Sequence, residues 1–463
     1  MRGKWMFTGL LLCLALMLLP AAAGRAALLP QPDAESLKED ALQVAEDMQT
    51  GNFAAVTEKF NAEMAAALDE DTLKSGWDSA VAILGDFLET ISAESYEQGA
   101  YVVVDILEHY ENNGMKLHIV YDGEGKIAGM QITYADVEEY EEETQSEDGA
   151  AAYTEEEVTV TADERVPLGG TLTLPVDVEK PPVVILVHGS GSSDRDENIN
   201  GNKPFADIAH GLAARGIAVL RYDKRYYVYP DCPDVGSAEM VTLREESLDD
   251  VDAAIKLMQE DARVDGSHIF VLGHSLGGCL CPAIAAEHPQ LTGIISMAGS
   301  LRPLWEISYD QNQEVIAAAE AGNLTEEQQA QLAEAAEQVE ADTKILREDL
   351  DNQPDDGMLL GIPARYWKSI KEYCGMNFIN EVKMPVLVLQ GDADFQVYPE
   401  KDYALWQEAL GGRDNVVFHL YEGLNHLMMP TQGKRDITEY AVKSHVDTQV
   451  IDDIAEFIMD VVK

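Results

Sequence analysis

Basic residues are scarce in this chain. Its 463 residues include 32 Lys and Arg against 84 Asp and Glu, a formal net charge of -52. A field of that sign repels nucleic-acid phosphates and anionic lipid, so the charge balance argues against nucleic-acid and membrane-surface partners. Because 46% of the residues are hydrophobic, the chain can still bury a large core, and its length predicts two or three folded units.

Cysteine is also rare, with five residues in the whole chain. Cys13 lies in the N-terminal apolar segment, and the others are too few for a disulfide framework, although a single bridge is compatible with them. Cys279 and Cys281 lack a second pair at the spacing of a zinc site. We therefore expect buried free thiols and no metal site.

Apolar runs long enough to cross a membrane are missing after the N-terminal segment MRGKWMFTGLLLCLALMLLPAAAGRA. That segment begins with Arg2 and Lys4, continues with an apolar run ending at Leu19 and then has small residues, which is the pattern of a secretory signal peptide cut near Ala23 or Ala26. An uncleaved anchor is the alternative, but the run is short for a membrane span. We predict a signal peptide at residues 1–26 and a secreted or extracytoplasmic mature protein.

Residues 27–135 combine helical patterns with a predicted meander. The helical patterns run from Glu35 to about Thr90, and turns with Asn and Gly then separate the strand-like runs that follow. These runs cover residues 101–110, 115–122 and 126–134. The layout predicts a small α+β domain and resembles the nuclear-transport-factor-like modules that often precede secreted hydrolases. It carries no recognisable catalytic set.

The acidic stretch 136–157 has few hydrophobic residues and is typical of a solvated linker. After it, strands rich in Val, Ile and Leu alternate with amphipathic helices, the pattern of a parallel sheet covered on both faces. The strand-like runs cover residues 181–189, 217–223, 268–274, 293–299, 384–392 and 415–423. Residues 158–463 are therefore predicted to form an α/β doubly wound domain with a mostly parallel sheet.

One connection in this domain is much longer than a crossover requires. The segment at about 301–380 is mostly helical and acidic, and we expect it to fold as a cap insertion over the sheet. Trp305 lies in it and is a candidate for substrate binding, although packing in the core of the insertion is the more common fate of a single aromatic residue.

The motif Gly-His-Ser-Leu-Gly-Gly at 273–278 indicates a candidate catalytic nucleophile. It follows a predicted strand and precedes a predicted helix, as a nucleophile elbow requires. Glycine at 273 and 277 lets strand and helix approach, while Ser275 takes a strained backbone conformation at the turn. The pattern also arises by chance, so the other parts of an active site must support Ser275 as the nucleophile.

A glycine-containing loop, HGSGSSDRDE at 188–197, follows an earlier strand. In this type of site one oxyanion-binding N–H comes from the residue after the nucleophile, here Leu276, and another from such a loop. Ser190 is the expected second donor, and His188 and Gly189 are expected to contact substrate. A phosphate site is the alternative, but the glycine spacing is wrong for it and acidic residues follow directly.

The acid and the histidine should follow later strands, in that order. The loop GDADFQV at 391–397 offers Asp392 and Asp394 as candidate acids. Its resemblance to the Gly-x-x-Asp-x-x-Val pattern of α/β-hydrolases favours Asp394, with Asp392 as the alternative. His426, in EGLNH, is the histidine in a loop directly after a late strand.

Together these motifs, with LGGTLTLP (168–175) and RYDKR (221–225), make residues 158–463 resemble a secreted serine α/β-hydrolase of the esterase and acyl-hydrolase type. The resemblance implies cleavage of a small-molecule acyl ester through an acyl-enzyme on Ser275, with His426 as base and Asp394 orienting it, and without a cofactor. One departure is YYVYPDCPD after RYDKR, where relatives tend to be rich in glycine, so this rim of the site is expected to differ.

Other reactions use the same catalytic residues. Thioester cleavage and acyl transfer to an acceptor other than water stay open. A prolyl-oligopeptidase-like peptidase would usually carry a propeller of repeated blades, and the residues before the linker show no repeat. A non-catalytic binding protein on this fold would lack a member of the triad, and none is missing.

Overall fold

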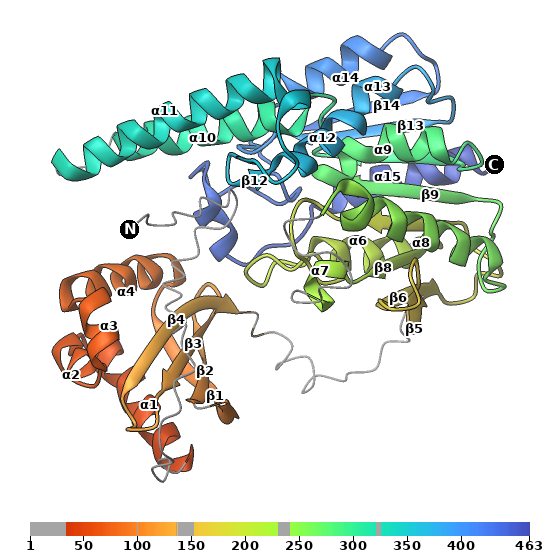
Figure 1. Cartoon of the computed structure of the whole chain (residues 1–463). Helices are drawn as coiled ribbons and strands as arrows, with labels where there is room; N and C mark the ends of the chain where they lie inside the picture. The colour runs from red at the N-terminus through yellow and green to blue at the C-terminus, as the bar shows by residue number, and fades with distance from the viewer. Residues whose placement is uncertain (1–33, 100, 136, 138–151, 230–240, 321–325) are drawn as a thin grey trace.

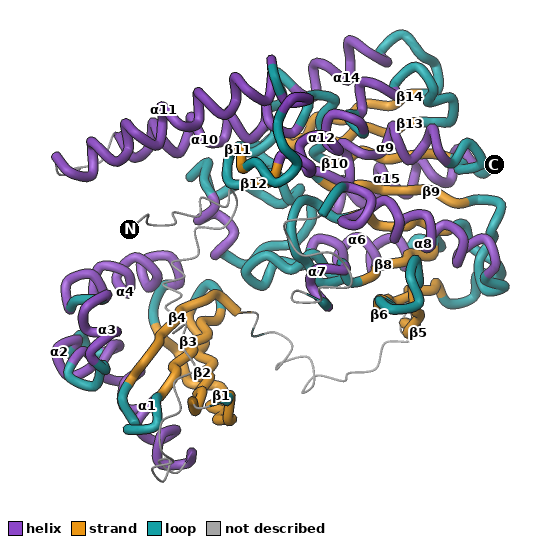
Figure 2. The backbone as a smooth tube through the Cα atoms, in the orientation of Figure 1, coloured by secondary structure: helices purple, strands orange, loops and turns teal. Residues whose placement is uncertain are grey.

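The computed structural model describes residues 34–463 except 100, 136, 138–151, 230–240 and 321–325. The predicted signal peptide and most of the predicted linker lie outside the described residues. Figures 1 and 2 show a small N-terminal unit and a larger C-terminal unit, each built around its own sheet. In the described part of the chain, no helix has the length and apolar character needed to span a bilayer.

The small domain packs its helices against a four-stranded antiparallel sheet of order β1-β2-β3-β4. Its elements are α1 (Ala34–Gln49), α2 (Phe53–Thr57), α3 (Ala62–Ala67), α4 (Glu70–Leu84), β1 (Phe87–Gln98), β2 (Tyr101–Tyr110), β3 (Gly114–Tyr121) and β4 (Ile127–Ala135). Buried side chains of α1, such as Val44 and Met48, meet those of the central strands, such as Val104 and Leu117, in a single core. The predicted meander is therefore present, with one more strand than the sequence pattern indicated.

The extra strand corrects the prediction that helix extends to about Thr90. Helix α4 ends at Leu84, and Gly85 follows with a φ of 81°, a conformation that suits glycine and stops the helix. Strand β1 was not predicted because its sequence, FLETISAESYEQ, is mostly exposed and lacks a buried alternation. Its pairing with β2, a tertiary interaction, decides its conformation.

The larger domain contains an eight-stranded sheet of order β14-β13-β10-β9-β7-β8-β6-β5. The strands are β5 (Tyr153–Val160), β6 (Leu168–Pro175), β7 (Val183–Val187), β8 (Ala218–Tyr222), β9 (Ile269–His274), β10 (Gly293–Met297), β13 (Val386–Gly391) and β14 (Val416–Tyr421). Strand β6 is antiparallel to both β5 and β8, and the remaining pairings are parallel. This order is the mostly parallel, doubly wound α/β-hydrolase sheet that the sequence predicted, and the prediction is confirmed.

Helices cover both faces of this sheet (Figure 1). They are α6 (Pro204–Ala213), α7 (Arg225–Val228), α8 (Asp249–Glu260), α9 (Leu276–Glu287), α14 (Asp402–Leu410) and α15 (Thr448–Val461), with a π-helical turn, η2 (Arg244–Leu248), before α8. Alternate residues of β7 divide between two cores: Ile185 belongs to the core that includes residues of α8, α9 and α14, while Leu186 belongs to the core that includes residues of α6 and α15. Burial on both faces explains why the strand sequences are continuously apolar.

A mainly helical insertion separates β10 from β13. It contains α10 (Leu304–Glu320), α11 (Glu326–Glu348), η3 (Leu350–Asn352), β11 (Met358–Leu359), β12 (Ile362–Pro363), α12 (Ala364–Glu372) and α13 (Gly375–Phe378). Figure 1 shows α10 and α11 side by side as a long hairpin that projects from the domain. The shorter elements lie closer to the sheet, where Tyr366 and Trp367 join the hydrophobic core.

The linker predicted at 136–157 ends earlier than expected, because β5 begins at Tyr153. Glu155, Glu156 and Glu157 are residues of this edge strand, and charge on an edge strand opposes pairing with other chains. They also meet basic partners on neighbouring elements, as Glu155 does with Arg221 and Glu157 with Arg195. Local composition alone could not distinguish this charged edge strand from a solvated linker.

Candidate active site

Ser275 lies between the last residue of β9 and the first residue of α9. Its backbone has φ 53° and ψ −114°, and a positive φ of this kind is rare for residues other than glycine. Surrounding structure must enforce such strain, which is found preferentially at functional sites. The turn places Ser275 at the N-terminus of α9, where unpaired N–H groups favour negative charge.

The glycines around Ser275 are needed because backbones approach closely at this turn. A Cβ atom added to Gly273 would lie 2.1 Å from the carbonyl oxygen of Gly277, and one added to Gly277 would lie 2.2 Å from that of Val187. No side chain can be accommodated at such distances. The sequence pattern at 273–277 is therefore explained by the contact of α9 with β9 and β7.

His426 and Asp394 form a buried pair at the same edge of the sheet. Asp394 follows β13 and His426 follows β14, and His426 Nδ1 lies 2.8 Å from Asp394 Oδ2. The carboxylate accepts a hydrogen bond, so Nδ1 carries the proton and Nε2 is left as an acceptor. The other carboxylate oxygen accepts hydrogen bonds from the amides of Gln396 (2.8 Å) and Val397 (3.0 Å), which hold it in place.

Asp392, the alternative acid, has a different setting. Its side chain is exposed, and Oδ1 accepts a hydrogen bond of 2.6 Å from the Gly423 amide. It therefore holds the turn after β14. The structure brings Asp394, and not Asp392, to His426.

The residue before Ser275 connects the elbow to the loop of His426. The ring of His274 lies with its centroid 4.8 Å from that of His426, and its Nε2 lies 3.0 Å from the His426 carbonyl oxygen. Among the described residues, no hydrogen bond joins the Ser275 hydroxyl to the His426 ring. Catalytic hydrogen bonds of this kind are often long without substrate and shorten when it binds.

The glycine-containing loop after β7 lies directly against Ser275. A Cβ atom added to Gly189 would lie 3.2 Å from Ser275 Cβ and 3.7 Å from its Oγ. The amides of Ser190, in this loop, and of Leu276, the first residue of α9, have no acceptor within the described part of the protein. Both are thus available to an oxyanion beside Ser275.

The amides on either side of Ser190 are already occupied. The Gly189 amide donates to Glu197 Oε1 at 2.6 Å, and the Gly191 amide donates to Glu246 Oε1 at 3.0 Å. Two buried carboxylates therefore hold the loop by its neighbouring N–H groups and leave the Ser190 N–H free.

Glu197 also forms a buried ion pair with His274. His274 Nδ1 lies 2.8 Å from Glu197 Oε2, while Nε2 faces the carbonyl oxygen of His426, so with an ionised Glu197 both ring nitrogens must donate. Burial alone would lower the pKa of His274, but the adjacent Glu197 carboxylate raises that pKa above its ordinary value. Burial alone would likewise raise the pKa of Glu197, and His274 holds it below its ordinary value. An imidazolium–carboxylate pair therefore lies beneath the site.

A second buried pair holds the other side of the loop. Lys224 Nζ donates to the Gly189 carbonyl oxygen at 2.7 Å and to Glu246 Oε1 at 2.8 Å. Tyr366, from α12 of the insertion, donates to Glu246 Oε2 at 2.5 Å. The insertion is thereby tied to the loop that carries the free Ser190 amide.

Glu197, His274, Lys224 and Glu246 were not singled out by the sequence patterns. Glu197 and Lys224 occur in HGSGSSDRDE and RYDKR, and this proximity to the motifs was the available signal. The pairing itself is between distant positions, 77 residues apart for Glu197 and His274. Such a pair can be identified only in the folded structure, where the sheet brings the loop after β7 and the turn after β9 together.

His188, Gly189 and Trp305 were predicted to contact substrate. The His188 side chain is buried, its Nε2 donates to the Asp194 carbonyl oxygen at 2.9 Å, and burial lowers its pKa to about 4. Gly189 acts by leaving room for Ser275. Trp305 is buried in the core and lines a cavity of about 240 Å³ that includes none of the predicted catalytic residues. The structure thus gives His188 and Trp305 packing roles, and their contact with substrate stays a prediction.

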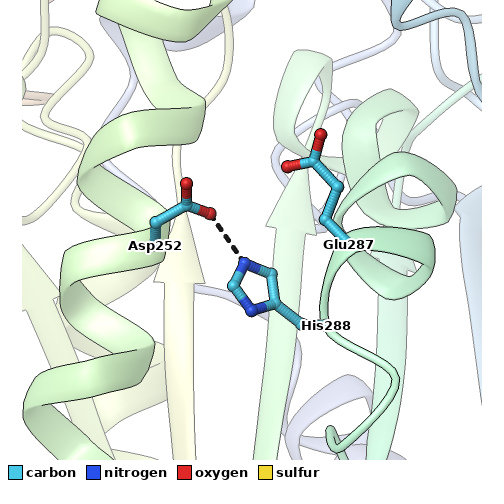
Figure 3. Close-up of side chains that lie close together, drawn as sticks. All are labelled: Asp252, Glu287 and His288. Carbon is cyan, nitrogen blue, oxygen red and sulfur yellow. Dashed lines mark hydrogen bonds and ion pairs between the residues drawn. The ribbon is translucent and has the colours of Figure 1, made fainter.

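One group of side chains could hold a metal ion (Figure 3). Asp252, Glu287 and His288 lie together, with His288 Nε2 2.6 Å from Asp252 Oδ1. Arg244 already pairs with both carboxylates, at 3.1 Å for Asp252. Since α9 has 12 residues, the group is about 18 Å along the helix from Ser275. We interpret it as an ion-pair cluster outside the active site.

Comparison with known proteins identifies the family of this chain. Residues 179–431 match a family described as serine aminopeptidase, S33, and residues 41–130 match a family described as a protein of unknown function. The chain is 33% identical over 421 residues to esterase EstD of Thermotoga maritima, covering 91% of this chain and 95% of that protein. Est1E from Butyrivibrio proteoclasticus is a more distant solved structure, with 18% identity and a TM-score of 0.41 over 66% of this chain and 98% of that one. The chain belongs to the serine aminopeptidase S33 family of α/β-hydrolases.

Proposed function

We propose that this protein is a serine esterase in which Ser275 is the nucleophile, His426 the general base and Asp394 the residue that orients it. The observation that carries the proposal is the meeting of the strained Ser275 turn and the buried His426–Asp394 pair at one edge of the sheet. The free amides of Ser190 and Leu276 beside Ser275 support an oxyanion hole.

The reaction follows from these positions. His426 Nε2 takes the hydroxyl proton of Ser275 as Oγ forms a bond to the ester carbonyl carbon, and the carbonyl oxygen becomes an oxyanion bound by the two amides. The bond to the alkoxy oxygen then breaks, and His426 donates its proton to the departing alcohol. Water repeats the sequence: it loses a proton to His426, attacks the acyl-enzyme, and releases the carboxylic acid with Ser275 restored.

The ester bond is the substrate class best supported. The relative aligned with nearly the whole chain is described as an esterase, and the match includes both domains. The family description names an aminopeptidase instead, and thioesters or acyl transfer would use the same residues. A direct comparison of substrates separates these reactions.

The test combines labelling with a substrate panel. We expect a fluorophosphonate probe to modify one serine per chain, on the peptide that contains Ser275, as mass spectrometry of the digested protein would reveal. We also expect p-nitrophenyl butyrate to be cleaved with a higher kcat/KM than an alanine p-nitroanilide or an acyl thioester. A panel in which the anilide is the best substrate would favour the peptidase, and labelling elsewhere would contradict the proposed site.

We also propose that the protein is exported by its N-terminal segment. The basic start, short apolar run and small residues of positions 1–26 support this. The full-length gene product expressed in a bacterium should appear outside the cytoplasm with a new N-terminus after Ala23 or Ala26, measured by N-terminal sequencing. Uncleaved protein retained in the cytoplasm would contradict export.

A further inference from the structure

The turn between β2 and β3 of the small domain makes a specific contact with the hydrolase domain. Asn113 is 2% exposed, and its Nδ2 donates to the carbonyl oxygens of Asn200 at 2.7 Å and Ala441 at 3.2 Å. The neighbouring Asn112 carbonyl oxygen accepts a hydrogen bond of 3.3 Å from the Lys443 amide. One buried amide group thus joins two segments of the hydrolase domain that are far apart in sequence.

Helix α4 adds to this contact. It packs against the 3₁₀ helix η4 (Ile437–Ala441), and Figure 1 shows the segment around η4 extending from the hydrolase domain towards α4. The small domain therefore touches the hydrolase domain along the segment that follows the loop of His426.

The first partner of Asn113, Asn200, lies just after the glycine-containing loop 188–197, which we call the oxyanion loop. Asn200 is three residues after Glu197, which binds the Gly189 amide and His274. Both Glu197 and Asn200 have a φ of 54°, a left-handed conformation that is uncommon for glutamate and more readily adopted by asparagine. A segment of this kind keeps its shape only while its contacts enforce it, and Asn113 supplies one of them.

The second partner of Asn113, Ala441, is linked by hydrogen bonds to the loop 391–397 that carries Asp394, which we call the acid loop. Ala441 follows Tyr440, whose hydroxyl accepts a hydrogen bond of 2.5 Å from the side-chain Nε2 of Gln396. The backbone N–H of Gln396 donates to Asp394 at 2.8 Å. Asn202 joins the segment of Asn200 to the segment of Ala441, because its Nδ2 donates to the Tyr440 carbonyl oxygen at 2.7 Å. The segments on which Asn113 acts therefore support the oxyanion loop on one side and Asp394 on the other.

We propose that the small domain is an intramolecular positioning module of the esterase, and that Asn113 is a positioning residue through which it orders the oxyanion loop and the acid loop. The readout by activity rests on the proposed esterase function. Misplacement of a catalytic group by about 1 Å can cost roughly 100-fold in rate, so contacts remote from the chemistry can matter in this way.

The test is Asn113→Asp in the full-length protein. Aspartate has the same shape and can still accept the Gly114 amide as Asn113 does (2.8 Å), but it places an oxygen where the N–H groups faced two carbonyl oxygens. We expect kcat for p-nitrophenyl butyrate to fall by about 10-fold or more with KM changed by less than about 2-fold, because the substrate site itself is untouched.

Asn112→Asp is the matched control. It makes the same chemical change one residue away, where the side chain donates to the Ile83 carbonyl oxygen of the small domain (2.8 Å) and, among the described residues, to no group of the hydrolase domain. We expect kcat within about 2-fold of wild type. Equal losses in the two variants would mean a damaged small domain and would overturn the proposal. An unchanged kcat in Asn113→Asp, or a change in KM alone, would overturn it too.

Hydrogen–deuterium exchange gives a readout that does not depend on activity. In Asn113→Asp, amide exchange should rise in peptides covering 189–202 and 437–444, and stay unchanged there in Asn112→Asp. Asn113→Ala, which removes the donors without adding charge, should show the same pattern and serves if Asn113→Asp does not fold. If the wild-type protein lacks esterase activity but the two variants differ in exchange as described, the esterase proposal is refuted and the positioning role stands. If exchange is unchanged in Asn113→Asp, the positioning role is refuted.

Discussion

Ser275→Ala is expected to lower kcat for a short p-nitrophenyl ester by about 10⁶-fold. The substitution removes the atom that forms the acyl-enzyme, while the Ser190 and Leu276 amides and the fold remain. The residual rate would come from oxyanion binding and substrate positioning alone. Steady-state kinetics and loss of fluorophosphonate labelling measure the effect, with thermal unfolding as a check that the variant is folded.

Ser190→Ala is the matched control for this prediction. It makes the same change of side chain at an exposed position of the oxyanion loop, and it keeps the backbone N–H that we assign to oxyanion binding. We expect it to retain kcat within about 10-fold of wild type. If Ser275→Ala kept labelling or a comparable rate, another residue would be the nucleophile.

Asp394→Asn should lower kcat by about 10⁴-fold. The carboxylate accepts the Nδ1 proton of His426 at 2.8 Å and so leaves Nε2 free to act as a base. An amide at this position can donate its N–H to Nδ1, which places the ring proton on Nε2 and leaves no base facing Ser275. The measurement is kcat together with its pH profile.

Asp392→Asn gives the comparison, since this residue is two positions away and undergoes the same chemical change. Its side chain is exposed and accepts the Gly423 amide, a contact that asparagine can also make. We expect kcat within about 3-fold of wild type. A larger loss in Asp392→Asn than in Asp394→Asn would reverse our assignment of the acid.

The comparison between these two aspartates shows where local sequence stops being informative. Both lie in GDADFQV after β13, and a pattern could favour one without excluding the other. The choice depends on how the loop folds: the backbone amides of Gln396 and Val397 bind one oxygen of Asp394 and direct its other oxygen to His426. Those bonds form only in the folded loop.

Other features were likewise decided by contacts between distant segments. Strand β1 exists because it pairs with β2, although its own residues are mostly exposed. Trp305 could have faced a substrate or a core, and the packing of the insertion placed it in the core. The ion pair of Glu197 with His274 joins loops that follow different strands, and neither residue alone marks a site.

The sequence by itself determined the parallel sheet, the turn at Ser275 and the chain order of Ser275, the loop 391–397 and His426. These follow from short-range physics: apolar runs suit strands buried on both faces, and glycine is required where backbones approach closely at 273 and 277. Only the tertiary structure decided which acid meets His426, how buried ion pairs leave the Ser190 amide free, and where the small domain touches the catalytic loops. Each of these depends on hydrogen bonds between residues far apart in the chain, whose geometry exists only once the whole domain has folded.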